Sequence, residues 1–136
     1  MSEPLVNVRY MVGDVQQSVD WYVGHLGFQP IGPQSPAFGA VQRGPLRLLL
    51  SGKMSSAGRA MPDGREPEPG GWNRLQLVFD DLAAEVARLR RRGVSFRNDI
   101  LTGPGGSQIL AEDPSGNVIE LFQPSQIAFA TLKAGV

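Results

Sequence analysis

The feature of this sequence that most constrains its fold is one order of secondary-structure patterns that occurs twice. Asp14 and Asp81 each follow a short apolar strand pattern, where an aspartate can cap the first turn of a helix. A glycine ends each helical pattern, at Gly27 and at Gly93. Three further strand patterns follow each helix. Because a repeat of this size buries only part of its own apolar surface, the two copies must fold together. We therefore expect two tandem βαβββ modules.

Apolar spacing predicts where the elements of each module lie. Module one covers about residues 5–52 and module two about residues 72–124, in a single domain of residues 1–136. The expected strands are 5–12, 28–31, 38–42 and 46–50, then 75–79, 94–97, 108–112 and 118–122, with one helix after the first strand of each module. This is an α+β fold, a cup-shaped mixed sheet with both helices on its outer face. Residues 53–71 lack periodicity, which predicts a loop that is either a lid over a ligand or a plain surface connection.

Composition excludes several classes of protein. The 136 residues include no cysteine, so a disulfide scaffold or a cysteine zinc site is excluded. Thirteen basic and thirteen acidic residues give zero net charge, so no overall field attracts nucleic acid or an anionic membrane. The N-terminal residues lack the pattern of a secretion signal, and no apolar run approaches the roughly 20 residues of a membrane span. We expect a cytoplasmic protein without nucleic-acid or membrane partners.

Alternation along the strands predicts which residues face away from the helices. That face is expected to carry Asn7, Arg9, Arg74, Gln76, Glu120 and Phe122, together with Leu46, Leu48 and Leu50. Apolar walls with a few polar groups are typical of a small-molecule site, although a solvated sheet face has a similar mixture. Trp72 and Asn73 are expected at the rim, where an indole could stack on a ligand and an amide could bind it. The ligand-binding residues proposed from the sequence are Asn7, Arg9, Leu48, Trp72, Asn73, Arg74, Gln76, Glu120 and Phe122.

Two segments resemble the motifs of a known superfamily. Residues 12–28, VGDVQQSVDWYVGHLGF, resemble the opening motif of the vicinal oxygen chelate superfamily, in which an aspartate is followed by an aromatic pair and by Leu-Gly-Phe. Residues 113–122, DPSGNVIELF, are similar to its closing motif. The superfamily takes in glyoxalase I, bleomycin-resistance proteins, fosfomycin-resistance enzymes and extradiol dioxygenases. The resemblance covers about residues 5–124 and implies the two-module fold, whereas activity varies within such a fold.

The resemblance also implies where a catalytic metal would lie. Counted from the capping aspartates, the four ligand positions of metal-using members fall on Asn7, Leu48, Arg74 and Glu120. Only Glu120 is a usual metal ligand, and the cation of Arg74 would repel a divalent ion. We therefore expect no cofactor, and a divalent metal is disfavoured.

These residues leave three functions open. The leading hypothesis is a small-molecule-binding protein of the bleomycin-resistance type, in which Arg74 and Glu120 face each other or one ligand in the cup between the modules. The alternative is a lyase, isomerase or dioxygenase-like enzyme that uses Glu120, the one catalytic candidate, as base or metal ligand. The third is an interaction module with an unused cup. Open sheet edges and the resemblance predict a homodimer.

Overall fold

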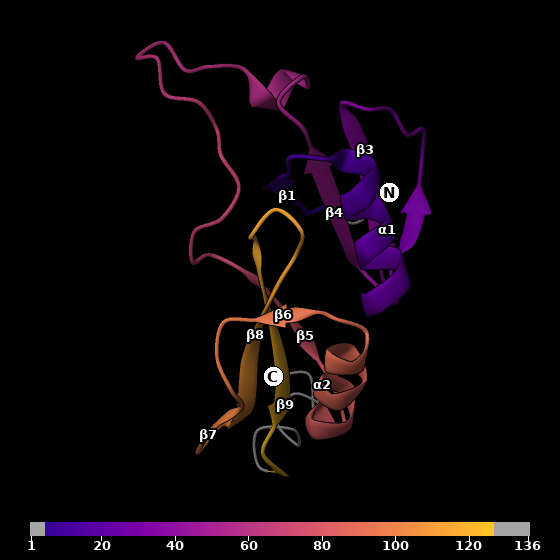
Figure 1. The fold of residues 1–136 in the computed structure, drawn as a ribbon, viewed down its shortest axis with the longest axis vertical. Coiled ribbons are helices and arrows are strands. Elements are labelled where there is room, and N and C mark those ends of the chain that lie inside the picture. The colour runs from indigo at the N-terminus through magenta and orange to yellow at the C-terminus, as the bar shows by residue number, and fades with distance from the viewer. Residues whose placement is uncertain (1–4, 127–136) are drawn as a thin grey trace. The chain divides into compact units, whose positions relative to one another are not determined.

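The computed structural model describes residues 5–126, which form two compact units (Figure 1). Unit 1 consists of residues 5–71 together with the turn 114–117, and unit 2 consists of residues 72–113 and 118–126. Each unit has one α-helix and one mixed sheet, so the predicted α+β class is confirmed. The described helices include none long and apolar enough to cross a membrane.

Unit 1 has a four-stranded sheet in the order β1-β4-β3-β2. Its elements are β1 (Asn7–Met11), α1 (Val15–Leu26), β2 (Gln29–Ile31), β3 (Phe38–Arg43), β4 (Leu46–Ser51) and the short 3-10 helix η1 (Ser56–Gly58). β1 runs parallel to β4, and the other two pairs are antiparallel.

Unit 2 repeats this order with one additional short strand. Its elements are β5 (Leu75–Val78), α2 (Leu82–Arg91), β6 (Ser95–Phe96), β7 (Leu101–Gly103), β8 (Gly106–Glu112) and β9 (Val118–Pro124). The strand order is β5-β9-β8-β6, and β7 also pairs with β8. β7 was not predicted from the sequence, because its three residues are all exposed and therefore have no buried face to produce a pattern.

Both helices begin and end as their sequences predict. The Asp14 carboxylate accepts a hydrogen bond from the Gln17 backbone N–H at 2.9 Å, and Asp81 accepts one from the Ala84 N–H at 3.1 Å. Gly27 has a φ of 71°, the left-handed conformation that glycine adopts without strain.

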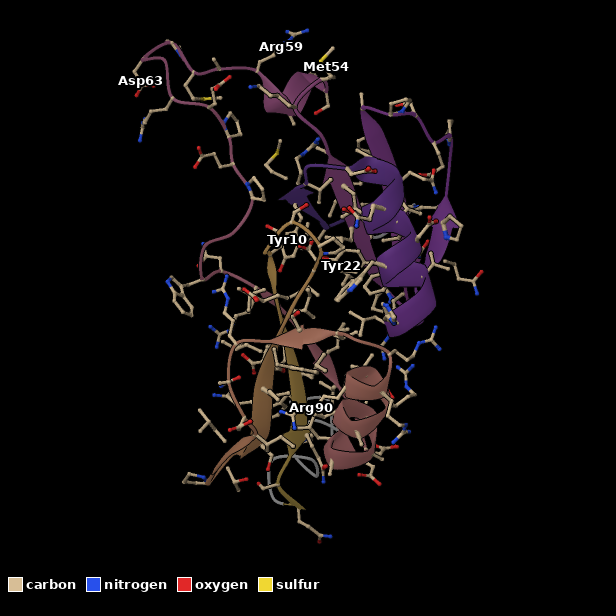
Figure 2. The ribbon with its side chains drawn as sticks, in the orientation of Figure 1. Tyr10, Tyr22, Met54, Arg59, Asp63 and Arg90 are labelled. Atoms are coloured by element: carbon tan, nitrogen blue, oxygen red, sulfur yellow. The ribbon has the colours of Figure 1, made fainter. Side chains whose placement is uncertain are left out.

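One stripe of each helix packs against its own sheet. The buried apolar residues are Val15, Val19, Tyr22 and Leu26 in α1, and Leu82, Val86 and Leu89 in α2. The Tyr22 ring is fully buried and packs edge-on against Phe28 with a centroid distance of 5.4 Å, while Tyr10 of β1 is also buried in this unit (Figure 2). Each buried side chain of this size contributes about 1.5–3 kcal/mol.

The register of β4 corrects one prediction. Val8 of β1 pairs with Leu48 and Arg9 pairs with Leu49, and paired residues share a face of the sheet. Leu48 and Leu50 are fully buried, on the same face as Tyr10 and therefore toward α1. The prediction that Leu46, Leu48 and Leu50 face away from the helix is wrong, and Leu48 is a core residue and not a ligand-binding one.

Different turn lengths explain this error. β3 and β4 join through two residues, Gly44 and Pro45, whereas β8 and β9 join through the five residues 113–117. The sequence-based placement of Leu48 at the position of Glu120 treats the two hairpins as equal, with Gly44 matched to Gly116. This match displaces β4 by one residue, and a displacement of one residue moves every side chain to the other face. Arg9 in unit 1 corresponds to Gln76 in unit 2. Because Arg9 pairs with Leu49 and Gln76 pairs with Glu120, Leu49 is the residue equivalent to Glu120.

The turn 114–117 is held within unit 1 by side-chain hydrogen bonds. The amide nitrogen of Asn117 donates to the Met11 carbonyl at 2.8 Å, and its amide oxygen accepts from the Gly70 N–H at 2.7 Å. The Ser115 hydroxyl accepts from the Gly13 N–H at 2.9 Å. Asn117 is 4% exposed, so the asparagine of the closing motif has a structural role here.

Candidate functional site

Each sheet has one face that its own helix does not cover, which we call the helix-free face. In unit 1 this face carries Asn7, Arg9, Met11, Phe38, Ala40, Gln42, Arg47, Leu49 and Ser51. In unit 2 it carries Gln76, Val78, Gln108, Leu110, Glu112, Val118, Glu120 and Phe122, and Arg74 precedes β5 on the same face. Most of the side chains that the sequence analysis proposed for ligand binding therefore lie on these two faces.

The Glu120 carboxylate accepts hydrogen bonds from the side chains of Arg74 and Gln76, an arrangement that we call the clasp. Its Oε1 atom accepts from Nε of Arg74 at 3.1 Å and lies 3.1 Å from Nη2 of the same residue. Its Oε2 atom accepts from Nε2 of Gln76 at 2.7 Å. The side chain of Glu120 is 9% exposed and that of Arg74 is 28% exposed. Because a buried carboxylate must be paired or hydrogen-bonded, these contacts are what allow Glu120 to be buried as an anion.

The four positions that the superfamily uses for a metal do not carry a fitting set of ligands. In unit 1 they are Asn7 and, in the corrected register, Leu49, a hydrocarbon with no donor atom. In unit 2 they are the cationic Arg74 and the clasped Glu120. No group of three or more His, Cys, Asp or Glu side chains that could hold a metal occurs within residues 5–126. Carboxylates and imidazoles are the side chains that bind catalytic divalent metals, so this set does not fit one.

Trp72 forms a stack that the sequence analysis did not predict. The Arg97 guanidinium lies over the indole, with Cζ 4.7 Å from the ring centroid, and its Nε donates to Glu112 at 2.8 Å. Trp72 remains 69% exposed, and Asn73 beside it is exposed as well. The predicted strand 94–97 includes Arg97, but β6 comprises only Ser95–Phe96, and nothing in the local pattern indicates that Arg97 contacts Trp72, 25 residues earlier in the sequence.

Phe122 lies at a hollow on unit 2. This half-buried ring lines a cavity of about 270 Å³ with Gln108 and the β7–β8 turn. A role in ligand binding for Phe122, Trp72 or Asn73 stays a prediction.

A larger cavity lies on the helix-free face of unit 1. Its volume is about 330 Å³, and the residues that line it are Asn7, Ile31, Gly32, Pro33, Phe38, Ala40, Arg47 and Leu49. Of these residues, only Asn7 was predicted from the sequence to bind a ligand. Arg47 and Leu49 were missed because Leu46, Leu48 and Leu50 were predicted to lie on this face; in the correct register, alternation along β4 identifies them. Arg9 lies on the same face and donates from Nη1 to the buried Ser51 hydroxyl at 2.9 Å.

The clasp predicts unequal effects for its two charged members. Arg74→Met should lower the free energy of unfolding by about 1–2 kcal/mol, because Glu120 then stays buried without its cation. Glu120→Gln should lower it by less than about 1 kcal/mol, since the more exposed Arg74 can turn to water. Urea unfolding measures both values, with Arg91→Met, an exposed arginine of α2, as the matched control. A larger loss of unfolding free energy in Glu120→Gln than in Arg74→Met would contradict the finding that Glu120 is the more deeply buried member of the pair.

Comparisons with known proteins agree with this geometry. Residues 5–121 match the family model described as Glyoxalase/Bleomycin resistance protein/Dioxygenase superfamily. The solved structure of TnmS3, an antibiotic-binding protein from Streptomyces sp. CB03234, is 30% identical with a TM-score of 0.69, covering 91% of this chain and 98% of that one.

Two further solved structures share the fold at lower identity. A member of the same superfamily from Sphaerobacter thermophilus is 24% identical, covering 90% of this chain and 98% of its own, with a TM-score of 0.69. The lactoylglutathione lyase of Agrobacterium tumefaciens is 16% identical, covering 90% and 95%, with a TM-score of 0.70. No curated protein matches the sequence. The match over residues 5–121 and the 30% identity to TnmS3 show that the chain belongs to the glyoxalase/bleomycin resistance protein/dioxygenase superfamily.

Proposed function

We propose that this protein binds a small organic molecule on the helix-free faces of its sheets and needs no catalytic metal to do so. The observation that carries the proposal is the clasp of Glu120, whose two oxygens accept hydrogen bonds from Arg74 and Gln76. The charge of this carboxylate is already balanced by the Arg74 guanidinium, whose positive charge would also repel a metal cation. The antibiotic-binding protein from Streptomyces supports a binding role, since it is the relative with the highest identity among the three described above.

The clasp also disfavours the enzymatic alternative. A general base needs a lone pair aimed at the proton that it removes, within about 2.6–3.2 Å. Gln76 and Arg74 already donate to the oxygens of Glu120, at 2.7 and 3.1 Å. The contacts with Arg74 and Gln76 occupy three of the roughly four acceptor sites of the carboxylate, and the side chain is only 9% exposed, so a substrate proton has little access to it. The likeness to a lactoylglutathione lyase, at 16% identity, extends to the fold alone.

Metal-independent ligand binding is the test of this proposal. Protein dialysed against EDTA should contain far less than one divalent ion per chain and should gain no thermal stability from Mg²⁺, Mn²⁺, Ni²⁺ or Zn²⁺. Members of an antibiotic panel that bind should stabilise the EDTA-treated protein, by about 2.7 kcal/mol at a ligand concentration 100 times Kd. Isothermal titration calorimetry in EDTA then gives the affinity.

Two results would decide against the proposal. One is a stoichiometric metal whose removal abolishes ligand binding. The other is loss of that metal in Glu120→Gln, which would make Glu120 a ligand despite its clasp. An Asp99→Asn variant serves as control, because Asp99 is an exposed carboxylate of unit 2 whose partner is Arg90.

The remaining expectations stay predictions. They are the cytoplasmic location, the homodimer and the role of residues 53–71 as a lid. Within that loop η1 forms one short helical turn, and Met54 is 87% exposed. The Nζ atom of Lys53 lies 3.6 Å from Oε1 of Glu66.

A further inference from the structure

The helix-free face of unit 1 carries positive charge, and no carboxylate of residues 5–126 forms an ion pair with it. Strands β1 to β4 contain no aspartate or glutamate. Arg9 and Arg47 both lie on this face, on the neighbouring strands β1 and β4. Arg9 donates to the neutral Ser51 hydroxyl. Among residues 5–126, Arg47 has no carboxylate within ion-pair distance.

In unit 2, by contrast, most arginines form ion pairs with carboxylates. Four of them have carboxylate partners within 3.3 Å: Arg74 with Glu120, Arg88 with Glu85, Arg90 with Asp99, and Arg97 with Glu112. The equivalent of Glu120 in unit 1 is Leu49, which cannot pair with a cation. This position of the repeat is therefore occupied by a carboxylate that neutralises a cation in unit 2, Glu120, and by a hydrocarbon side chain in unit 1, Leu49.

The unbalanced cation lies at a cavity of suitable size. Arg47 is half-buried and pairs across the sheet with Asn7, and both line the cavity of about 330 Å³. Phe38, Ala40 and Leu49 provide apolar walls beside them. Small-molecule sites have volumes of roughly 300–1,000 Å³, with apolar walls and a few polar groups that orient the ligand. A guanidinium in such surroundings binds a planar carboxylate through two parallel hydrogen bonds.

We infer that this cavity binds an organic anion, with a carboxylate on Arg47 and Asn7 and an apolar body against Leu49 and Phe38. The inference rests on the proposed function and specifies its ligand as a carboxylate attached to an aromatic or aliphatic body. The anion supplies the negative charge that Glu120 supplies in unit 2. Its apolar part covers the hydrocarbon surface of Leu49.

A matched pair of probes separates charge from shape. 2-Naphthoate and 2-naphthamide have nearly the same shape, but only the first is an anion. The wild-type protein in EDTA is expected to bind the acid roughly 10- to 100-fold more tightly than the amide, as measured by isothermal titration calorimetry, because a hydrogen bond to a charged group is the stronger kind. Arg47→Met should remove this preference, and Arg47→Lys should keep part of it.

The matched control is Arg59→Met, which removes one positive charge from the same unit. Arg59 is an exposed residue of the loop after η1, away from the sheet (Figure 2). It should retain the full preference for the acid. Circular dichroism of each variant verifies folding, and Arg47→Lys keeps the test decisive if Arg47→Met does not fold.

The outcomes distinguish this inference from the proposed function. Equal affinity for the two probes, a preference that survives in Arg47→Met, or no binding of either probe at millimolar concentration would each overturn the organic-anion site. Metal-independent binding of antibiotics together with any of these three results would leave the proposed function in place. A metal requirement with an intact Arg47-dependent preference would overturn the proposed function alone.

Discussion

Leu48→Ala is expected to lower the free energy of unfolding by about 2–5 kcal/mol, whereas Leu49→Ala should lower it by less than about 1 kcal/mol. The two leucines are neighbours on β4 but lie on opposite faces of the sheet. Leu48 is fully buried on the face toward α1, so truncation leaves a cavity that the surrounding core cannot fill. Leu49 is half-buried on the helix-free face. Urea unfolding followed by circular dichroism measures both changes.

The affinity for a ligand should be reduced more by Leu49→Ala than by Leu48→Ala, the reverse of their effects on stability. Leu49→Ala removes an apolar wall of the cavity in unit 1 and should weaken 2-naphthoate binding roughly three- to tenfold. Leu48→Ala, at a temperature where it remains folded, should leave that affinity nearly unchanged. If Leu49→Ala destabilises the protein more than Leu48→Ala does, the pairing of Arg9 with Leu49 is incorrect.

Asn117→Ala is expected to cost about 2–3 kcal/mol of unfolding free energy, although it removes only a small side chain. The substitution leaves the Met11 carbonyl and the Gly70 N–H without the amide that binds both of them. Asn117 itself is 4% exposed, so water has little access to the space around its amide. The measurement is again urea unfolding at neutral pH.

Two other substitutions show which part of the amide matters. Asn117→Asp keeps an acceptor for Gly70 but places a carboxylate oxygen against the Met11 carbonyl, so it should destabilise at least as much as alanine does. Ser115→Ala removes one acceptor of the exposed Gly13 N–H and should cost less than about 1 kcal/mol. A loss below 1 kcal/mol in Asn117→Ala would mean that the turn 114–117 is held by its backbone and not by this amide.

The two units share one fold but carry different side chains at equivalent positions of their helix-free faces. In unit 2 the acidic position of the repeat is filled by Glu120 and neutralised by Arg74, which yields a stable polar cluster of low net charge. In unit 1 the equivalent position is Leu49, and the nearby Arg47 keeps its charge. The divergence of two equivalent positions therefore explains both the poor fit to a metal and the affinity that we expect for an anion.

Local patterns in the sequence were sufficient for much of the fold. α1 was predicted between Asp14 and Gly27 and extends over residues 15–26. The repeat and the two motifs were sufficient for the superfamily, because both depend on short-range order along the chain. Caps, turn residues and apolar periodicity act over a few residues, and each of them can be recognised without knowing any distant contact.

Only the tertiary structure decided which side chains form the candidate site. The face on which Leu48, Leu49 and Arg47 lie depends on the register of β4, which a difference in turn length between the two hairpins displaces by one residue. The hydrogen bond from Gln76 to Glu120, the stack of Arg97 on Trp72 and the contacts of Asn117 join residues 25 to 106 positions apart. Such contacts leave no periodic pattern in the sequence, because they form only when the strands have paired.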